Sequence, residues 1–210
     1  MSMVDSMLNS LFRQSCEIQA TIKKLKQTDY KYDEKNFNYL SRRLDILGEK
    51  YAYCIRQFCE KTFALKRCEI YDNASEVLGI EAHREGNQIV IDLPFLLPWK
   101  KHSGANFIGN PLRYQLEQLR GNGSLKFKEK VVICIVHMYN SENKKGRCYD
   151  YDNLESKRIL DVITSFTMPD DSPKYCDVFQ TSEFGDSDKT RIFVMPASEF
   201  YTPKNPCFPA

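Results

Sequence analysis

The spacing of the apolar residues changes near residue 70, and this change limits the folds open to the chain more than any other feature. In residues 4–25 and 37–58, apolar side chains recur every three or four positions, as on one face of an amphipathic helix. Beyond residue 70, short runs of β-branched and aromatic residues alternate with Gly- and Pro-containing turns, as in strands. The sequence therefore predicts an α+β protein in which a helical part precedes a small mixed-sheet domain.

The two helical stripes predict an antiparallel helical hairpin over residues 1–66. A polar break separates the stripes, and Asp33 is a suitable N-cap for the second helix. The stripes would either pack against each other or form a subunit interface, and the sequence leaves both arrangements open. No pattern here indicates chemistry, so we expect this part to bind at most an unidentified protein partner.

The remainder of the chain divides into three parts. We expect a connecting helix and strand over residues 67–86, a mixed-sheet domain over 87–198 and an irregular, proline-containing tail over 199–210. The apolar run KVVICIVHMY predicts a strand that is buried on both faces. A helix should begin with Pro111 in its first turn, and another should cover residues 153–165.

Composition excludes several classes of protein. Of the 210 residues, 42% are hydrophobic and 12% aromatic, which is too many for a disordered chain. No apolar stretch approaches the roughly 18 residues of a membrane span, and the N-terminus lacks the basic and apolar regions of a signal peptide. The eight cysteines form no C-x-x-C pair, so we expect reduced thiols rather than a zinc site. The prediction is a soluble, cytoplasmic protein without a membrane partner.

Charge is unevenly distributed along the second half of the chain. Residues 100–130 contain seven Lys or Arg and two Glu, whereas residues 150–188 contain ten Asp or Glu and three Lys or Arg. Chance clustering of surface charge is one explanation. The other is a metal-dependent enzyme acting on a polyanion, whose cations would contact DNA phosphates without reading bases. The candidate DNA-binding residues are Lys100, Lys101, Arg113, Arg120, Lys126, Lys128 and Lys130.

Three carboxylates are candidates for a metal site. Asp150 and Asp152 are two positions apart, and in an extended segment such side chains project to the same side. Oxygen ligands of this kind suit Mg²⁺ or Mn²⁺. Asp171 is the expected third carboxylate, because a helix over residues 153–165 advances about 20 Å and the six residues after it return about the same distance when extended. The three carboxylates would then meet at the N-terminus of that helix.

Each of these residues also has an explanation without chemistry. Asp152 is a fair N-cap for the expected helix. Lys157 and Asp161 are four residues apart and would form a solvated salt bridge. Asp171, with Asp170, lies between two prolines, which is ordinary turn composition. The combination of these residues behind a buried strand favours a functional site.

The order of these motifs resembles the RusA family of Holliday-junction endodeoxyribonucleases. The shared pattern is a buried strand, D-x-D-N-L at residues 150–154, a lysine at 157, L-D-V-I at 160–163, an Asp-Asp pair at 170–171 and a closing hairpin around Gly185. The resemblance extends from about residue 88 to residue 196. Residues 1–66 have no counterpart in the compact members of that family.

The resemblance implies a magnesium-dependent homodimer that cleaves branched DNA during recombination or repair, as such enzymes of prophages and mobile elements do. Asp150, Asp152 and Asp171 would be the catalytic metal ligands, and Lys157 would stabilise charge on the phosphate. One residue more than in the family pattern separates Leu154 from Lys157, which leaves Arg158 as an alternative to the lysine. The rival hypothesis is a catalytically idle module that binds DNA or protein, with the hairpin mediating the interaction.

Overall fold

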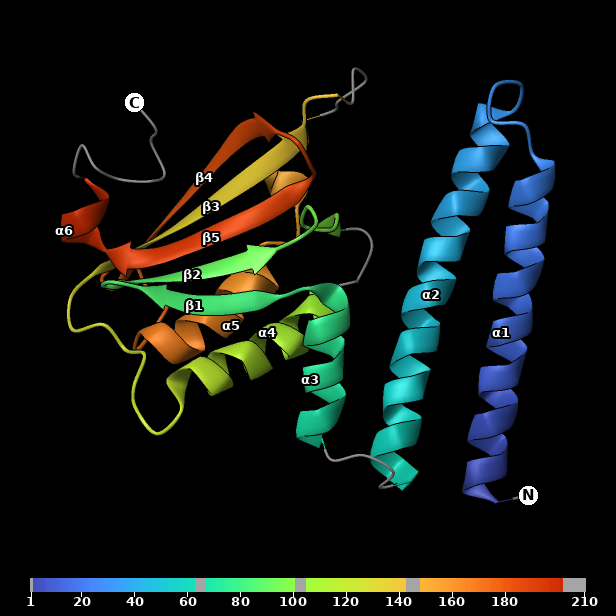
Figure 1. Ribbon diagram of the computed structural model, residues 1–210, viewed down its shortest axis with the longest axis horizontal. Coiled ribbons are helices and arrows are strands. Elements are labelled where there is room, and N and C mark those ends of the chain that lie inside the picture. Colours follow the sequence, from blue (N-terminus) through green and yellow to red (C-terminus); the bar gives the residue numbers. More distant parts are fainter. Residues whose placement is uncertain (1, 63–66, 101–104, 143–147, 202–210) are drawn as a thin grey trace. The chain divides into compact units, whose positions relative to one another are not determined.

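The computed structural model describes residues 2–62, 67–100, 105–142 and 148–201. The chain forms two compact units, Met1–Ile70 and Tyr71–Ala210. Three N-terminal helices precede a mixed sheet, and further helices lie between and after its strands, which confirms the predicted α+β class. The elements are α1 (Met3–Gln27), α2 (Glu34–Thr62), α3 (Arg67–Leu78), β1 (Glu81–Glu85), β2 (Gln88–Leu93), α4 (Ala105–Arg120), β3 (Val131–Asn140), the 3₁₀ turn η2 (Tyr151–Asn153), α5 (Lys157–Thr167), β4 (Cys176–Gly185), β5 (Lys189–Pro196) and α6 (Ala197–Phe200) (Figure 1).

The first unit is the predicted antiparallel hairpin of α1 and α2 (Figure 1). A capping box begins α1: the Asp5 backbone N–H donates to Ser2 Oγ at 3.1 Å, and the Ser2 backbone N–H donates to Asp5 Oδ2 at 2.9 Å. At α2, Asp33 Oδ1 accepts from the Asn36 backbone N–H at 3.1 Å, so its predicted capping role is confirmed. These caps satisfy backbone donors that have no partner inside the helix.

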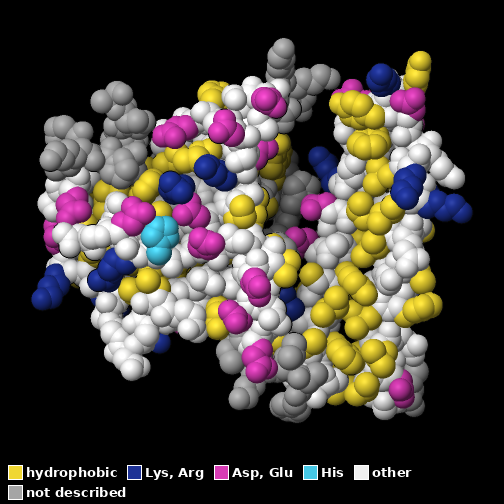
Figure 2. All heavy atoms as spheres, in the orientation of Figure 1, with side chains coloured by type: hydrophobic (Ala, Val, Ile, Leu, Met, Phe, Trp, Pro, Cys, Tyr) yellow, Lys and Arg dark blue, Asp and Glu magenta, His cyan; other side chains and the backbone are white. Residues whose placement is uncertain are grey.

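The hairpin buries few side chains and exposes many apolar ones. Thr21, Leu40 and Leu47 are buried, whereas Phe12 and Tyr53 remain 70% and 61% exposed. Apolar side chains accordingly form patches along the visible face of both helices (Figure 2). Two helices can cover only one stripe of each other, so the remaining apolar positions stay on the surface of this unit.

The second unit is built on a five-stranded mixed sheet in the order β1-β2-β5-β3-β4. All neighbouring strands are antiparallel except β3 and β4, which run parallel. The predicted closing hairpin around Gly185 is therefore wrong, because β3 lies between the two strands that flank this turn. The long apolar run of β3 explains this arrangement, since a strand buried on both faces belongs inside a sheet and not at its edge.

The main core lies between the sheet and helices α4 and α5, which cover the same face (Figure 1). On β3, the side chains of Val131, Ile133 and Ile135 enter this core, and Val132 and Cys134 enter a smaller cluster on the opposite face that includes Phe200 of α6. Both rows are buried, which confirms the prediction for this strand.

Two boundaries differ from the predictions. Helix α4 begins at Ala105, so Pro111 lies inside the helix and not in its first turn. Proline removes one backbone hydrogen bond there, and the burial of Leu112 and Leu116 against the sheet offsets that loss. In the expected tail, residues 199–200 belong to α6, and residues 202–210 lie outside the described residues. None of the helices in the described ranges is both long and apolar enough to cross a membrane.

Candidate functional site

Residues 150–152, which we call the D-Y-D segment, lie in the connection from β3 to α5, beyond the carboxyl end of β3. Residues Tyr151–Asn153 form a 3₁₀ turn, which the Asn153 backbone N–H closes by donating to the Asp150 carbonyl oxygen at 2.9 Å. The expected extended geometry is therefore wrong from Tyr151 onward. Asp150 and Asp152 are both exposed, and the Asp150 side chain makes no capping hydrogen bond within the described residues. Both carboxylates are thus open to solvent and to a ligand.

Tyr151, between the two aspartates, attaches the segment to the sheet. Its ring stacks on the ring of His137 in β3, with centroids 5.5 Å apart and planes 23° from parallel. Its hydroxyl lies 2.9 Å from Ser182 Oγ in β4. One aromatic contact and one hydrogen bond therefore locate the aspartates relative to two neighbouring strands.

The residues on either side of the D-Y-D segment are also held. The Tyr149 backbone N–H donates to the Tyr139 hydroxyl at 3.1 Å, and the Glu155 backbone N–H donates to the Pro98 carbonyl oxygen at 2.8 Å. Leu154 is fully buried and pairs with Trp99 through an isolated β-bridge. The segment is thus anchored before, within and after the two aspartates, although it belongs to a loop.

Helix α5 begins at Lys157, four residues later than predicted. Its N-cap is Ser156, so the explanation of Asp152 as the cap of this helix is wrong. Lys157 occupies the first position of α5 and is exposed. Arg158 turns toward α4, where its Cγ atom lies 3.8 Å from the position that a Cβ atom would take at Gly109. Of the two predicted cationic candidates, Arg158 therefore lies beside α4, and Lys157 is exposed at the start of α5.

Asp171 lies at the other end of the sheet from Asp150 and Asp152. It precedes Ser172, whose carbonyl oxygen accepts from the backbone N–H of Cys176, the first residue of β4. Cys176 is opposite Val131 at the start of β3, whereas Ser182, the partner of Tyr151, lies six positions further along β4. Six positions along a strand correspond to about 20 Å.

The predicted meeting of the three carboxylates is consequently wrong for a single chain. No group of three or more His, Cys, Asp or Glu side chains within the described ranges is arranged to hold a metal ion. The physical reason is the direction of β4: in a strand–helix–strand unit with parallel strands, the first connection leaves one end of the sheet and the second returns to the opposite end.

The predicted DNA-binding residues divide between the two ends of the sheet. Lys100 is exposed beside Trp99, next to the D-Y-D segment, and Lys101 lies outside the described residues. The other five belong to α4 or to the segment between α4 and β3. Arg113 and Arg120 lie 5.8 Å and 5.7 Å from the ring centroid of Phe166, and Lys130 Nζ lies 2.8 Å from Asp177 Oδ1. Lys126 and Lys128 are exposed.

Sequence reasoning did not include His137, Gln180 or Ser182 in the site. His137 interrupts the apolar run of β3, and this single polar residue was the only available signal. Burial lowers its pKa, while the contact between His137 Nε2 and Gln180 Oε1 at 3.2 Å opposes that shift. The imidazole is therefore neutral near pH 7.

Cys176, near Asp171, is not a nucleophile at pH 7. Burial, and after it the charge of Asp177, raises the pKa of its thiol to about 11.

Fold and site together define an α+β protein with a mixed five-stranded sheet and an exposed acidic segment at the carboxyl end of the inner strand β3. The chain belongs to DUF6100, a protein family of unknown function, whose pattern matches residues 2–203. This range contains both the hairpin and the sheet unit, so the two parts belong to one family pattern. No curated protein matches the chain.

Proposed function

We propose that the protein is a magnesium-dependent endonuclease that acts on branched DNA. The observation that carries this proposal is the pair of exposed aspartates, Asp150 and Asp152, held at the carboxyl end of β3 by the contacts of Tyr151. The resemblance of the surrounding motifs to the RusA family supports the choice of substrate. Such an enzyme would act in the cytoplasm on recombination or repair intermediates of a phage or mobile element.

The chemistry of the donor groups fits a hard cation. Mg²⁺ binds proteins through one or two carboxylates and keeps waters and substrate phosphates as its other ligands. Asp150 and Asp152 would hold the ion, and when bound there it would activate water and neutralise charge on the phosphate. Lys157, exposed at the N-terminal end of α5, would add a positive charge beside the phosphate, and the helix dipole has the same sign there.

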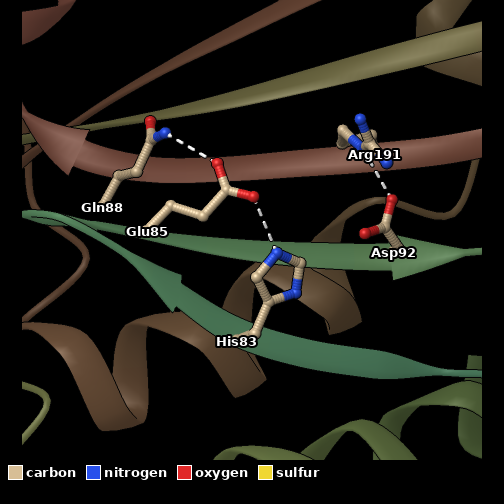
Figure 3. A network of polar contacts seen from close by, with 5 residues as sticks. All are labelled: His83, Glu85, Gln88, Asp92 and Arg191. Carbon is tan, nitrogen blue, oxygen red and sulfur yellow. Dashed lines mark hydrogen bonds and ion pairs between the residues drawn. The ribbon is translucent and has the colours of Figure 1, made fainter.

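The position of Asp171 points to a homodimer formed through β4. Of the two edge strands, β1 carries Glu81, His83, Arg84 and Glu85, and such charges discourage edge pairing. His83 Nε2 lies 2.9 Å from Glu85 Oε1, in a polar network at this edge that also includes Gln88 (Figure 3). By contrast, β4 is ten residues long and exposes apolar side chains along its length: Val178, Phe179 and Phe184.

One antiparallel register of two β4 strands suits these residues. With Thr181 opposite its own copy, Val178 lies opposite Phe184 of the second chain, and no two like charges are opposed. The antiparallel direction carries the Asp171 end of one copy to the Asp150 and Asp152 end of the other. Each end of the dimer sheet would then carry two carboxylates from one copy and Asp171 from the other, and the two-fold axis would relate two sites for paired cuts.

The same pairing would place two lysines of one copy, Lys126 and Lys128, near Asp150 and Asp152 of the other. Lys126 and Lys128 are exposed near the start of β3, the end of the sheet at which Asp171 lies. Lys100 adds positive charge from the chain that supplies Asp150 and Asp152. DNA phosphates on both sides of a cleavage site would thus meet cations from two subunits.

A cleavage assay on labelled four-way junctions tests the proposed function. We expect cuts with Mg²⁺ or Mn²⁺ and none with excess chelator, and we expect much slower cutting of a linear duplex of the same sequence. Absence of any cleavage with either metal, under conditions in which the junction is bound, would favour the binding-module hypothesis. Absence of both binding and cleavage would reject the nucleic-acid hypothesis.

A further inference from the structure

A row of polar side chains crosses three strands on the helix-covered face of the sheet. In register, His137 of β3 lies between Ser182 of β4 and Thr190 of β5. The same face of β3 is apolar up to this point, with Ile133 and Ile135 in the main core. Tyr151 of the D-Y-D segment contacts the polar row, because its ring stacks on His137 and its hydroxyl lies beside Ser182.

Burial of the polar His137 side chain at this position lowers the stability of the fold. Its side chain is 0% exposed, and Thr190 is 1% exposed. The Gln180 Oε1 atom can only accept, so His137 Nε2 carries the proton in their contact and Nδ1 presents a lone pair. Neither Nδ1 nor Thr190 Oγ1 has a hydrogen-bond partner among the described residues. Because unpaired buried polar atoms destabilise a fold, stability alone would favour an apolar residue here.

Tyr151 contacts two members of this polar row, His137 and Ser182. Its ring is stacked on His137, and its hydroxyl lies 2.9 Å from Ser182 Oγ. The contact to Gln180 fixes the plane of the imidazole, and the plane of the imidazole in turn sets the orientation of the tyrosine ring. The exposed neighbours of Tyr151 are Asp150 and Asp152, so the orientation of this ring contributes directly to where both carboxylates lie.

We propose that His137 is a positioning residue for the Asp150 and Asp152 pair. It touches neither carboxylate and acts through Tyr151, for which it supplies a flat, rotationally fixed surface. A leucine would fill the same space without a polar penalty, but it would offer no ring to stack on. The positioning role is a property of the fold, and its consequence for metal binding rests on the proposed function.

Hydrogen exchange of the full-length protein tests this inference without any metal or DNA. We expect His137→Leu to accelerate exchange of the amides in residues 148–155 by about tenfold, the effect of losing one aromatic contact. Exchange in strands β2 and β5 should stay unchanged. His137→Phe retains a ring and should change exchange by less than about threefold. Thr190→Val, in the same row but on the other side of His137 from Ser182, is the matched control and should leave the segment as protected as in the wild type.

Two results would overturn the inference: unchanged exchange of residues 148–155 in His137→Leu, or equal acceleration throughout the sheet, which would mark a merely structural role. A Mn²⁺ titration of the same proteins separates the inference from the proposed function. Weaker binding by His137→Leu, by about fivefold or more, extends the positioning role to the metal site. If the wild type binds no Mn²⁺, the proposed metal site fails while the exchange result still decides the role of His137.

Discussion

Lys130 Nζ lies 2.8 Å from Asp177 Oδ1 and joins the start of β3 to β4. Both side chains are about one-third exposed, at 39% and 34%. Lys130, the last Lys or Arg of residues 100–130, is therefore already paired within the protein. Lys126 and Lys128, a few residues earlier, are exposed. The sequence alone does not distinguish these three lysines, whereas the structure shows that Lys126 and Lys128 are more available to DNA phosphates than Lys130.

This ranking predicts how DNA affinity depends on salt. Each phosphate contact contributes about −0.9 to the slope of log affinity against log salt concentration. We expect the double variant Lys126→Gln/Lys128→Gln to make the slope shallower by about 1 to 2, and Lys130→Gln to change it by less than about 0.5. Fluorescence anisotropy on a four-way junction from about 50 to 200 mM salt would measure both slopes. Equal effects of the two variants would contradict the ranking.

Asp152→Asn tests the metal site directly. The change removes a negative charge at an exposed position and alters the volume of the side chain little. We expect metal-dependent cleavage to fall by about 100-fold or more, while the free energy of unfolding changes by less than about 0.5 kcal/mol. Single-turnover cleavage and urea unfolding measure the two quantities. Asp186→Asn, another exposed carboxylate beyond the end of β4, is the control and should cut normally. Normal cutting by Asp152→Asn would show that the site is assigned to the wrong residues.

The buried imidazole of His137 predicts a pH dependence of stability. Burial lowers its pKa in the folded protein below the value of about 6.5 in the unfolded chain. Below that pH the unfolded chain binds a proton that the folded protein excludes, so acidification reduces the free energy of unfolding. The contribution is complete above about pH 6.5 and decreases as the pH falls toward the folded pKa, by at most about 1.4 kcal/mol per pH unit.

Urea unfolding at pH 7.5 and pH 5.0, for the wild type and His137→Leu, measures this dependence (the two values bracket the ordinary histidine pKa). We expect the wild type to lose more stability on acidification than the variant, because other groups cancel in the difference. Identical losses would mean that His137 titrates alike in the folded and unfolded states.

The exposed edge of β4 predicts a dimer that a single charge disrupts. Phe184 is 67% exposed and would lie opposite Val178 of the second copy. We expect the full-length protein to be a dimer at tens of micromolar, the affinity range of a modest interface, and Phe184→Lys to be monomeric with an unchanged fold. Light scattering and circular dichroism measure these properties.

A matched substitution and a truncation complete the dimer experiment. Tyr53→Lys places the same charge on an exposed apolar position of α2 and should leave a β4 dimer intact. A chain beginning at Tyr71, the first residue of the second compact unit, should also remain dimeric. Dissociation by Tyr53→Lys or by the truncation, but not by Phe184→Lys, would move the interface to the hairpin and leave Asp171 without a partner site.

Local patterns in the sequence determined much of the architecture. The three- and four-residue spacing predicted both hairpin helices, and Asp33 marked the start of the second one. The apolar run of residues 131–139, interrupted only by His137, predicted a strand buried on both faces. Each of these features depends on side chains close together in sequence, and burial of one stripe or one face follows from them directly.

The way in which distant parts of the chain combine became clear from the assembled fold alone. The direction of β4 placed Asp171 and Asp150 at opposite ends of the sheet, and the insertion of β3 separated the strands expected to form a hairpin. The register of three strands put His137 beneath Tyr151. Strand order and direction depend on which long-range pairing buries the most apolar surface, and the residues flanking a connection do not encode that choice. The acidic motif was therefore visible in the sequence, whereas the groups that support it became apparent only once the sheet was assembled.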